Sequence, residues 1–343
     1  MTGSLSYPFE TIPEEGAAIE VAPDILWMRL PLPMALDHVN VYAIADGDGW
    51  VIVDTGFFSK RGVAIWKGLL AGPLQGKPVS EVIFTHHHPD HIGMAGWFQS
   101  EHGAQLLTTR TAWLMARMLT LDVQPVPTPE AITFYTRGGM DPEILEKRKS
   151  ERPFNFADCV APMPQGYRRI KQGDRIRLGD RIWDVRIGHG HAPEHATFWS
   201  DDGIVLGGDQ LLPSISPNLG LYPNEPEADP VSDWLQACAG FQSFATDDQL
   251  VLPGHKLPFY GLPLRLRQLI DNHHGALDRL LDFLKTSHSA HECFLTLFKR
   301  EIRGGEYGLA LVEAMAHCHH LYLSGQVTRS MREDGAYLYQ TKD

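Results

Sequence analysis

Four groups of histidine and aspartate, each following a short apolar run, are the residues of this sequence best suited to chemistry. The first group spans residues 86–91 and comes directly after Val-Ile-Phe-Thr. His191, Asp209 and His255 follow three further apolar runs, each with glycine just before the polar residue. Imidazole and carboxylate are ligands of divalent metal ions. The sequence therefore predicts a metal centre assembled at the ends of four separate strands.

The spacing within residues 86–91 favours two ions rather than one. His86 and His88 are two positions apart in an extended segment, so their rings point the same way and can chelate one ion. Asp90 and His91 lie beyond the turn at Pro89 and would face a second ion. A single histidine is as often a structural side chain as a ligand. The complete set favours a metal site over that alternative.

The elements that must position these residues alternate between strand and helix. β-Branched and aromatic runs bounded by turn residues recur through the first 260 residues, with helical patterns between some of them. This alternation predicts an α/β fold with mixed sheets. The expected strands are 39–44, 50–54, 81–85, 104–109, 181–187, 196–200, 204–207 and 250–252, and the expected helices are 60–70, 92–102 and 229–244.

Two segments depart from this alternation. Residues 110–165 are rich in proline and include a helical pattern over 129–150, and an insertion of this length predicts a lid near the site. From residue 262 the chain is mainly helical, with helices over 266–284 and 307–323 and a closing β-hairpin over 326–339. We therefore expect a catalytic domain over residues 1–260 and a small C-terminal domain over residues 261–343.

Motifs within residues 20–260 resemble those of the metallo-β-lactamase superfamily. They are Val53-Asp54-Thr55-Gly56, the segment from His86 to His91, Gly190-His191, Gly208-Asp209 and Gly254-His255. The resemblance implies an αββα sandwich, with two mixed sheets and helices outside, and two bound Zn²⁺ ions, with Mn²⁺ or Fe²⁺ as alternatives. It also implies the ligands: His86, His88 and His191 for one ion, Asp90, His91 and His255 for the other, and Asp209 bridging both.

A finer resemblance concerns the segment 190–195, where His195 follows the implied ligand by four positions. This arrangement is similar to hydroxyacylglutathione hydrolases and lactamase-beta-like endoribonucleases, and the tail over residues 313–339 resembles the winged-helix domain of those proteins. His195 would orient a ligand, contact substrate or serve the structure alone. Asp54 is implied to orient a ligand histidine. His87 is expected to be structural, and for His38 packing is favoured over a place in the lining of the site.

The chemistry implied by this ligand set is hydrolysis. Two ions about 3.5–4 Å apart share a bridging water whose pKa falls far enough to supply hydroxide near neutral pH. Asp90 or Asp209 would accept the proton, so these two residues and His195 are the catalytic candidates. No cysteine replaces His191 or Asp209, which disfavours a thiolate-bearing lactamase site.

Fold and metal site leave the substrate open. The leading hypothesis is a small-molecule thioester or ester of an organic acid, and the alternatives are an endoribonuclease, a lactonase or a β-lactamase. The formal net charge is −12, and residues 261–343 hold ten basic and ten acidic side chains. The excess of acid therefore lies in the first 260 residues. The negative electrostatic potential of this region repels polyphosphate chains, so nucleic acid is not expected to be a partner.

The spacing of the cysteines and the hydropathy of the sequence indicate the cellular compartment of the protein. The four cysteines are widely spaced, which is typical of reduced thiols rather than of a disulfide framework. No basic start leads into an apolar run, and no stretch approaches the roughly 18 apolar residues of a membrane span. We expect a cytoplasmic protein without membrane contact. The tail lacks a basic recognition surface, so it is expected either to pack between subunits of a homodimer or to border the neighbouring active site.

Overall fold

The computed structural model describes residues 4–342 and divides into two compact units. Unit 1 comprises Met1–Val123, Asn155–Pro217 and Phe244–Arg265, and unit 2 comprises Gln124–Phe154, Asn218–Ser243 and Leu266–Asp343. The predicted lid segment is thus shared, because its central part groups with the C-terminal residues. Its role as a lid stays a prediction. The predicted domain boundary after residue 260 also stays a prediction, because each compact unit combines segments from separate parts of the chain.

Unit 1 is built on two mixed sheets, as the sequence predicted. The first has the strand order β1-β2-β3-β4-β5-β6-β7 and the second β12-β11-β10-β9-β8. The strands of the first sheet are β1 (Ile19–Ala22), β2 (Ile25–Pro31), β3 (His38–Asp46), β4 (Gly49–Val53), β5 (Val79–Ile83), β6 (Gln105–Thr108) and β7 (Arg168–Arg169). Those of the second are β8 (Arg175–Leu178), β9 (Arg181–Gly188), β10 (His195–Ser200), β11 (Ile204–Gly208) and β12 (Leu250–Pro253).

The apolar side chains of the first sheet alternate between two cores. On β4, Val51 and Val53 belong to a cluster that also contains Phe198 of β10 and Leu252 of β12, so this cluster lies between the sheets. Trp50 and Ile52, on the opposite face of the same strand, belong to a cluster shared with helices. Successive side chains of a strand point to opposite faces, so a sheet buried on both sides needs apolar residues at nearly every position.

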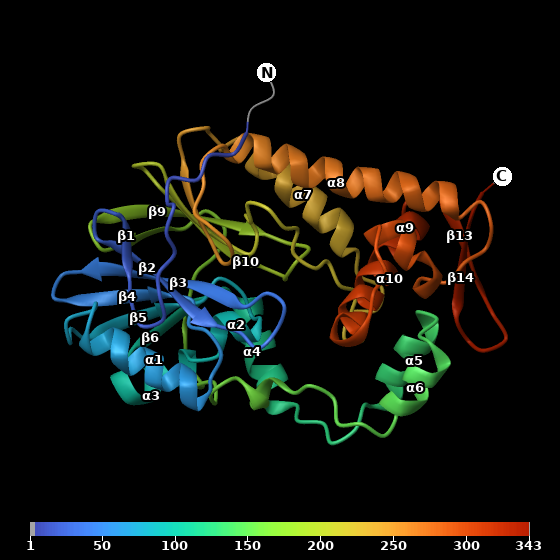
Figure 1. Ribbon diagram of the computed structural model, residues 1–343, viewed down its shortest axis with the longest axis horizontal. Helices are drawn as coiled ribbons and strands as arrows, with labels where there is room; N and C mark the ends of the chain where they lie inside the picture. Colours follow the sequence, from blue (N-terminus) through green and yellow to red (C-terminus); the bar gives the residue numbers. More distant parts are fainter. Residues whose placement is uncertain (1–3, 343) are drawn as a thin grey trace. The chain divides into compact units, whose positions relative to one another are not determined.

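Helices α1 (Lys60–Ala71), α2 (Pro89–Ile92), α3 (Ala95–His102) and α4 (Arg110–Leu121) follow strands of the first sheet. Trp66 of α1 packs edge-on against Phe98 of α3, with ring centroids 4.7 Å apart, and both belong to the helix-side core. Ser59 caps α1 by accepting a hydrogen bond from the Gly62 amide. Figure 1 shows α1 and α3 together on one face of this sheet. These features form an α/β arrangement of two mixed sheets, with helices packed on the outer face of the first sheet.

Strand direction brings the candidate ligands to one edge. In the second sheet β9 and β11 are both antiparallel to β10, and β11 is parallel to β12. The carboxyl ends of β9, β11 and β12 therefore lie on the same side, where β10 begins with His195. In the first sheet β5 is parallel to both of its neighbours and delivers residues 86–91 at its own carboxyl end.

Unit 2 is mainly helical. Its elements are α5 (Pro129–Arg137), α6 (Pro142–Arg148), α7 (Pro230–Phe241), most of α8 (Leu262–Phe283), η2 (His291–Cys293), α9 (Phe294–Phe298), η3 (Gly304–Glu306), α10 (Tyr307–Leu323) and the hairpin of β13 (Val327–Met331) and β14 (Tyr337–Thr341). The expected helix over 129–150 is wrong in one respect, because Gly138 and Gly139 divide it into α5 and α6. Gly139 has φ +71, a left-handed conformation that interrupts a helix.

No helix within residues 4–342 is long and apolar enough to cross a membrane.

Gly93 allows α2 to approach the loop after β4, which gives a test of packing. A Cβ at Gly93 would lie 2.3 Å from the Gly56 carbonyl oxygen and 2.7 Å from the Phe58 amide nitrogen. We expect Gly93→Ala to destabilise the protein by about 3 kcal/mol, because backbone cannot yield as a side chain can. Gly68→Ala is the matched control. No atom lies within 4 Å of its added methyl group, so alanine should stabilise α1 by roughly 0.5–1 kcal/mol. Equal thermal denaturation midpoints for the two variants would contradict this prediction.

Candidate metal centre

The seven predicted ligands converge at the edge where these strands end. Their nitrogen and oxygen atoms form three groups, within each of which all the ligand atoms lie within 4.8 Å of one another. The groups are His86, His88 and His191; Asp90, His91 and His255; and His86, His91 and Asp209. The first two are the ligand sets implied by the family resemblance, and the third shows Asp209 beside a histidine of each. Assigning them as metal ligands remains a prediction.

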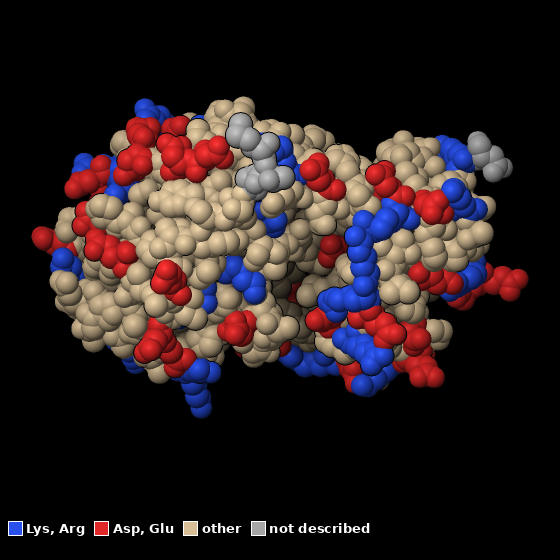
Figure 2. Space-filling view, turned by 45° about the horizontal axis from the view of Figure 1, so that its top comes forward, with Lys and Arg blue, Asp and Glu red and all other residues tan. Residues whose placement is uncertain are grey.

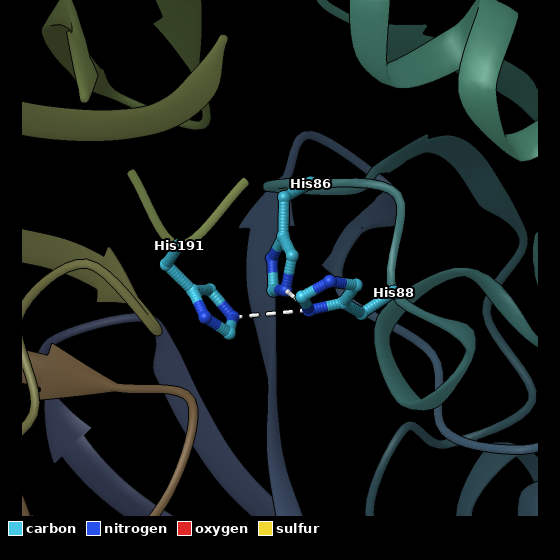
Figure 3. Close-up of side chains that lie close together, drawn as sticks. All are labelled: His86, His88 and His191. Atoms are coloured by element: carbon cyan, nitrogen blue, oxygen red, sulfur yellow. Dashed lines mark hydrogen bonds between the residues drawn. The ribbon is translucent and has the colours of Figure 1, made fainter. Parts of the chain in front are cut away.

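The first triad presents three ring nitrogens to a common point. His86 Nε2 and His191 Nε2 each lie 3.0 Å from Nδ1 of His88, as the dashed lines in Figure 3 show. Two nitrogens bound to one tetrahedral zinc ion at about 2.0–2.1 Å would be separated by about 3.3 Å. The spacing of the three rings therefore fits a shared cation.

The second triad is similarly close. His255 Nε2 and His91 Nε2 lie 3.3 and 3.5 Å from Asp90 Oδ2. Asp209 contacts both triads, with Oδ2 at 3.5 Å from His191 Nε2 and Oδ1 at 3.4 Å from His91 Nε2. A carboxylate in this position has one oxygen available for each of two neighbouring cations.

Two atoms of this cluster point to a cation as their partner. Among the described residues, His91 Nε2 and Asp209 Oδ1 are buried without a hydrogen-bond partner. His91 Nδ1 lies 2.8 Å from the Asp54 carboxylate, which can only accept, so Nδ1 carries a proton and Nε2 is the ring nitrogen directed at Asp90 and Asp209. The neighbouring carboxylates raise the pKa of His91 despite its burial, so without an ion the ring is protonated, and a divalent ion could take the place of the Nε2 proton and satisfy both atoms. The donor set of nitrogen and oxygen fits such an ion.

Burial and charge act in opposite directions on the ring pKa values. Burial, together with the neighbouring rings, holds the pKa of His86 and of His88 well below the ordinary value. Burial also opposes protonation of His255, but Asp209 and Asp90 outweigh it and raise its pKa to about 10. Asp209 in turn has its pKa lowered well below the ordinary value by His255 and His91, despite burial. Without an ion, the ionised Asp209 is therefore balanced by the protonated rings of His255 and His91, whose protons a divalent cation could replace.

Asp54 orients a candidate ligand, as its motif implied. Its φ of +59 is unusual for a residue other than glycine, and its side chain is buried. Its carboxylate accepts hydrogen bonds from His91 Nδ1 and from the amide and hydroxyl of Thr85. This contact fixes the orientation of the His91 ring.

His195, predicted as a catalytic candidate, lies beside the ligands and is fully buried. Its Nε2 accepts a hydrogen bond from the Asp209 amide at 3.1 Å, and its ring stacks on His86 with centroids 4.5 Å apart. Gly208 leaves room for it, because a Cβ there would lie 2.6 Å from the His195 ring. Of the three alternatives left open by the sequence, this placement favours a positioning role over contact with substrate.

His87 and His38, expected to be structural, are outside the ligand groups. His87 is buried and neutral, since burial lowers its pKa to about 3. His38 supports the loop that carries His255: its carbonyl oxygen lies 2.7 Å from His255 Nδ1, and its Nε2 accepts from the Lys256 amide. Beyond packing, His38 therefore positions the candidate ligand His255 through these two contacts.

Two supporting residues were absent from the sequence-based set. Thr85 contacts Asp54 and His86. Asn40 is fully buried on β3 and donates to the carbonyls of Pro253 and Lys256, which flank His255. A polar residue inside an apolar run was the only signal for Asn40. For Thr85 the signal was its position immediately before the histidine motif.

Comparison with known proteins agrees with this geometry. The family described as "Metallo-beta-lactamase superfamily" matches residues 34–255. The chain belongs to the metallo-β-lactamase superfamily. A second family, described as "Metallo-beta-lactamase-like, C-terminal domain", matches residues 277–342. The C-terminal region is therefore one found with this superfamily, while its winged-helix character stays a prediction.

Individual members of the metallo-β-lactamase superfamily resemble the whole chain. A β-lactamase domain protein from Burkholderia ambifaria is 34% identical, with a TM-score of 0.91 and 98% of each chain covered. A metallo-β-lactamase family protein from Thermus thermophilus is 26% identical, with a TM-score of 0.78, covering 94% of this chain and 100% of the other. A probable metallo-hydrolase from Bacillus subtilis (strain 168) is 25% identical over 270 residues, covering 76% of this chain and 81% of that protein. Within the superfamily, the chain is a metallo-hydrolase with a His/Asp cluster suited to metal ions.

Proposed function

We propose that this protein is a dinuclear metal-dependent hydrolase that cleaves a thioester or ester of a small organic acid. The observation that carries the proposal is the convergence of two triads on one carboxylate, Asp209. A zinc pair is the proposed cofactor, with Mn²⁺ or Fe²⁺ as alternatives. When bound, such ions lower the pKa of water and polarise a substrate carbonyl.

The chain's own residues supply the rest of the reaction. Asp90 is the one ligand carboxylate that remains partly exposed, with 17% of its side chain accessible, so it can reach substrate or water as well as a cation. It is the proposed proton acceptor. Asp209 is more deeply buried, with 8% of its side chain accessible, and would hold the two triads at a fixed distance from each other. His195 keeps the Asp209 backbone in place.

The substrate class is supported by charge and by the family resemblance noted in the sequence. Acidic and basic side chains are interspersed on the face shown in Figure 2. The net charge of −12 disfavours polyphosphate chains such as RNA. The motif at residues 190–195 resembles that of both hydroxyacylglutathione hydrolases and lactamase-beta-like endoribonucleases, and the acidic net charge favours the acyl chemistry of the first group over RNA cleavage. The partner is therefore proposed to be a small molecule, and the proposed compartment is the cytoplasm.

A substrate panel tests this proposal. Zinc-loaded protein should hydrolyse at least one member of a set of glutathione thioesters, coenzyme A thioesters and aryl esters, and a chelator should abolish that activity. The panel also includes lactones, a β-lactam and single-stranded RNA at physiological salt. Turnover of the β-lactam or a lactone alone, or cleavage of RNA with sub-micromolar binding, would refute the acyl substrate while leaving the metal centre in place.

A further inference from the structure

We infer that the hydroxyl of Thr85 connects the two metal triads to one carboxylate, so that Asp54 orients a ligand in each of them. Asp54 reaches His91 of one triad directly and His86 of the other through Thr85. The inference rests on the proposed metal centre, and it assigns Thr85 as a positioning residue.

The Asp54 carboxylate accepts three hydrogen bonds in a buried position. Oδ1 accepts from the Thr85 amide at 2.8 Å. Oδ2 accepts from the Thr85 hydroxyl at 3.0 Å and lies 2.8 Å from His91 Nδ1. Thr85 and Asp54 are only 1% and 2% exposed, so water does not compete for these contacts. The strained backbone of Asp54 is the local requirement for this arrangement.

The direction of each hydrogen bond follows from the chemistry of the groups. A hydroxyl has one hydrogen, and that of Thr85 is given to the carboxylate, which cannot donate. Towards His86 Nδ1, at 2.9 Å, the Thr85 oxygen can then only accept. His86 therefore carries its ring proton on Nδ1 and its lone pair on Nε2. That Nε2 is the atom 3.0 Å from Nδ1 of His88.

Removing the hydroxyl should affect the two triads unequally. Contacts behind ligand histidines fix the tautomer and ring orientation, and their loss lowers metal affinity by about 10–100-fold. Thr85 contacts the ring of His86 alone, so the triad of His86, His88 and His191 loses its support. The triad of Asp90, His91 and His255 keeps the direct contact from Asp54. Loss of the Asp54 carboxylate should weaken both.

The test compares Thr85→Val with Thr85→Ser, because the serine keeps the hydroxyl. Zn²⁺ is titrated into metal-free full-length protein against a chromophoric chelator, which resolves two binding steps. Thr85→Val should weaken one step by roughly tenfold or more and leave the other within about threefold. Thr85→Ser should resemble wild type. Asp54→Asn should weaken both steps. Thr108→Val is the matched control, since Thr108 is also buried but its hydroxyl donates to a backbone carbonyl, that of Phe84, rather than to Asp54 or to a candidate ligand.

A spectroscopic readout separates this role from general stability. Nitrogen NMR of metal-free protein with labelled histidine should show His86 protonated on Nδ1 in wild type and Thr85→Ser, and a tautomer mixture in Thr85→Val. Should the valine variant not fold, Thr85→Ala serves in its place. Two unchanged binding steps in the hydroxyl-free variant, or a wild-type His86 protonated on Nε2, would overturn the inference alone. Wild-type protein that binds no Zn²⁺ would overturn the proposed function as well.

Discussion

Replacing Asp209 with asparagine is expected to reduce kcat on the best substrate of the panel by on the order of a thousandfold. Asparagine has nearly the same shape but no negative charge, so it cannot serve two cations at once. Stabilisation by bound metal contributes several kcal/mol to the transition state, and each 1.36 kcal/mol corresponds to tenfold in rate. Loss of about 4 kcal/mol gives the expected factor.

The control for this variant is Asp201→Asn. Asp201 forms an exposed ion pair with Arg175, with the acid 69% accessible, and contributes little to stability. Its kcat should equal that of wild type. Initial rates at saturating substrate, with zinc content measured in parallel, provide the comparison. An Asp209→Asn enzyme that retains a tenth or more of wild-type kcat would show that the carboxylate is not part of the reaction centre.

Metal content should be about two equivalents per chain in wild-type protein and close to one in Asp90→Ala. Asp90 belongs only to the triad with His91 and His255, so its loss should empty that site and spare the other. The remaining triad keeps its three imidazole nitrogen donors, which are sufficient ligands for zinc. Plasma emission spectrometry of zinc-supplemented, gel-filtered protein gives the stoichiometry.

His274→Ala provides the comparison for metal content. His274 is exposed on α8 in unit 2 and stands outside the ligand groups, so its removal should leave two equivalents. Circular dichroism should show the same secondary structure in all three proteins. A trace of metal in wild type despite supplementation, or one equivalent lost from both variants, would exclude the proposed centre.

Much of the site could be predicted because its signals are local in sequence. A strand of alternating or fully apolar residues followed by a histidine or aspartate is visible within ten residues, and its position at a sheet edge follows from strand geometry. Helix α10 was predicted with its observed ends, residues 307–323, because its apolar pattern extends over the full helix. The prediction of an α/β fold with mixed sheets rests on the same periodicities, whereas the sandwich of two such sheets was implied by the family resemblance.

Some elements escaped prediction for physical reasons. Strand β2 was missed, because Ile25–Pro31 is buried on both faces and its apolar run has no period that distinguishes strand from helix. Strand β7 has only two residues, which is too short for any pattern. The break between α5 and α6 depends on Gly139, which packs against Ser289, a residue far away in sequence.

The sequence by itself determined the type of fold, the seven candidate ligands and the strand ends that carry them. Only the tertiary structure decided which residues hold Nδ1 of His86 and of His91, and so which nitrogen of these two rings is directed at the cluster. Asp54 and His91 are separated by 37 positions, and His38 and His255 by 217. Periodicity and spacing are properties of neighbouring residues, whereas hydrogen-bond partners depend on where distant segments meet. That is why the candidate ligands were predictable from the chain, while the contacts of Thr85, Asn40 and His195 required the folded protein.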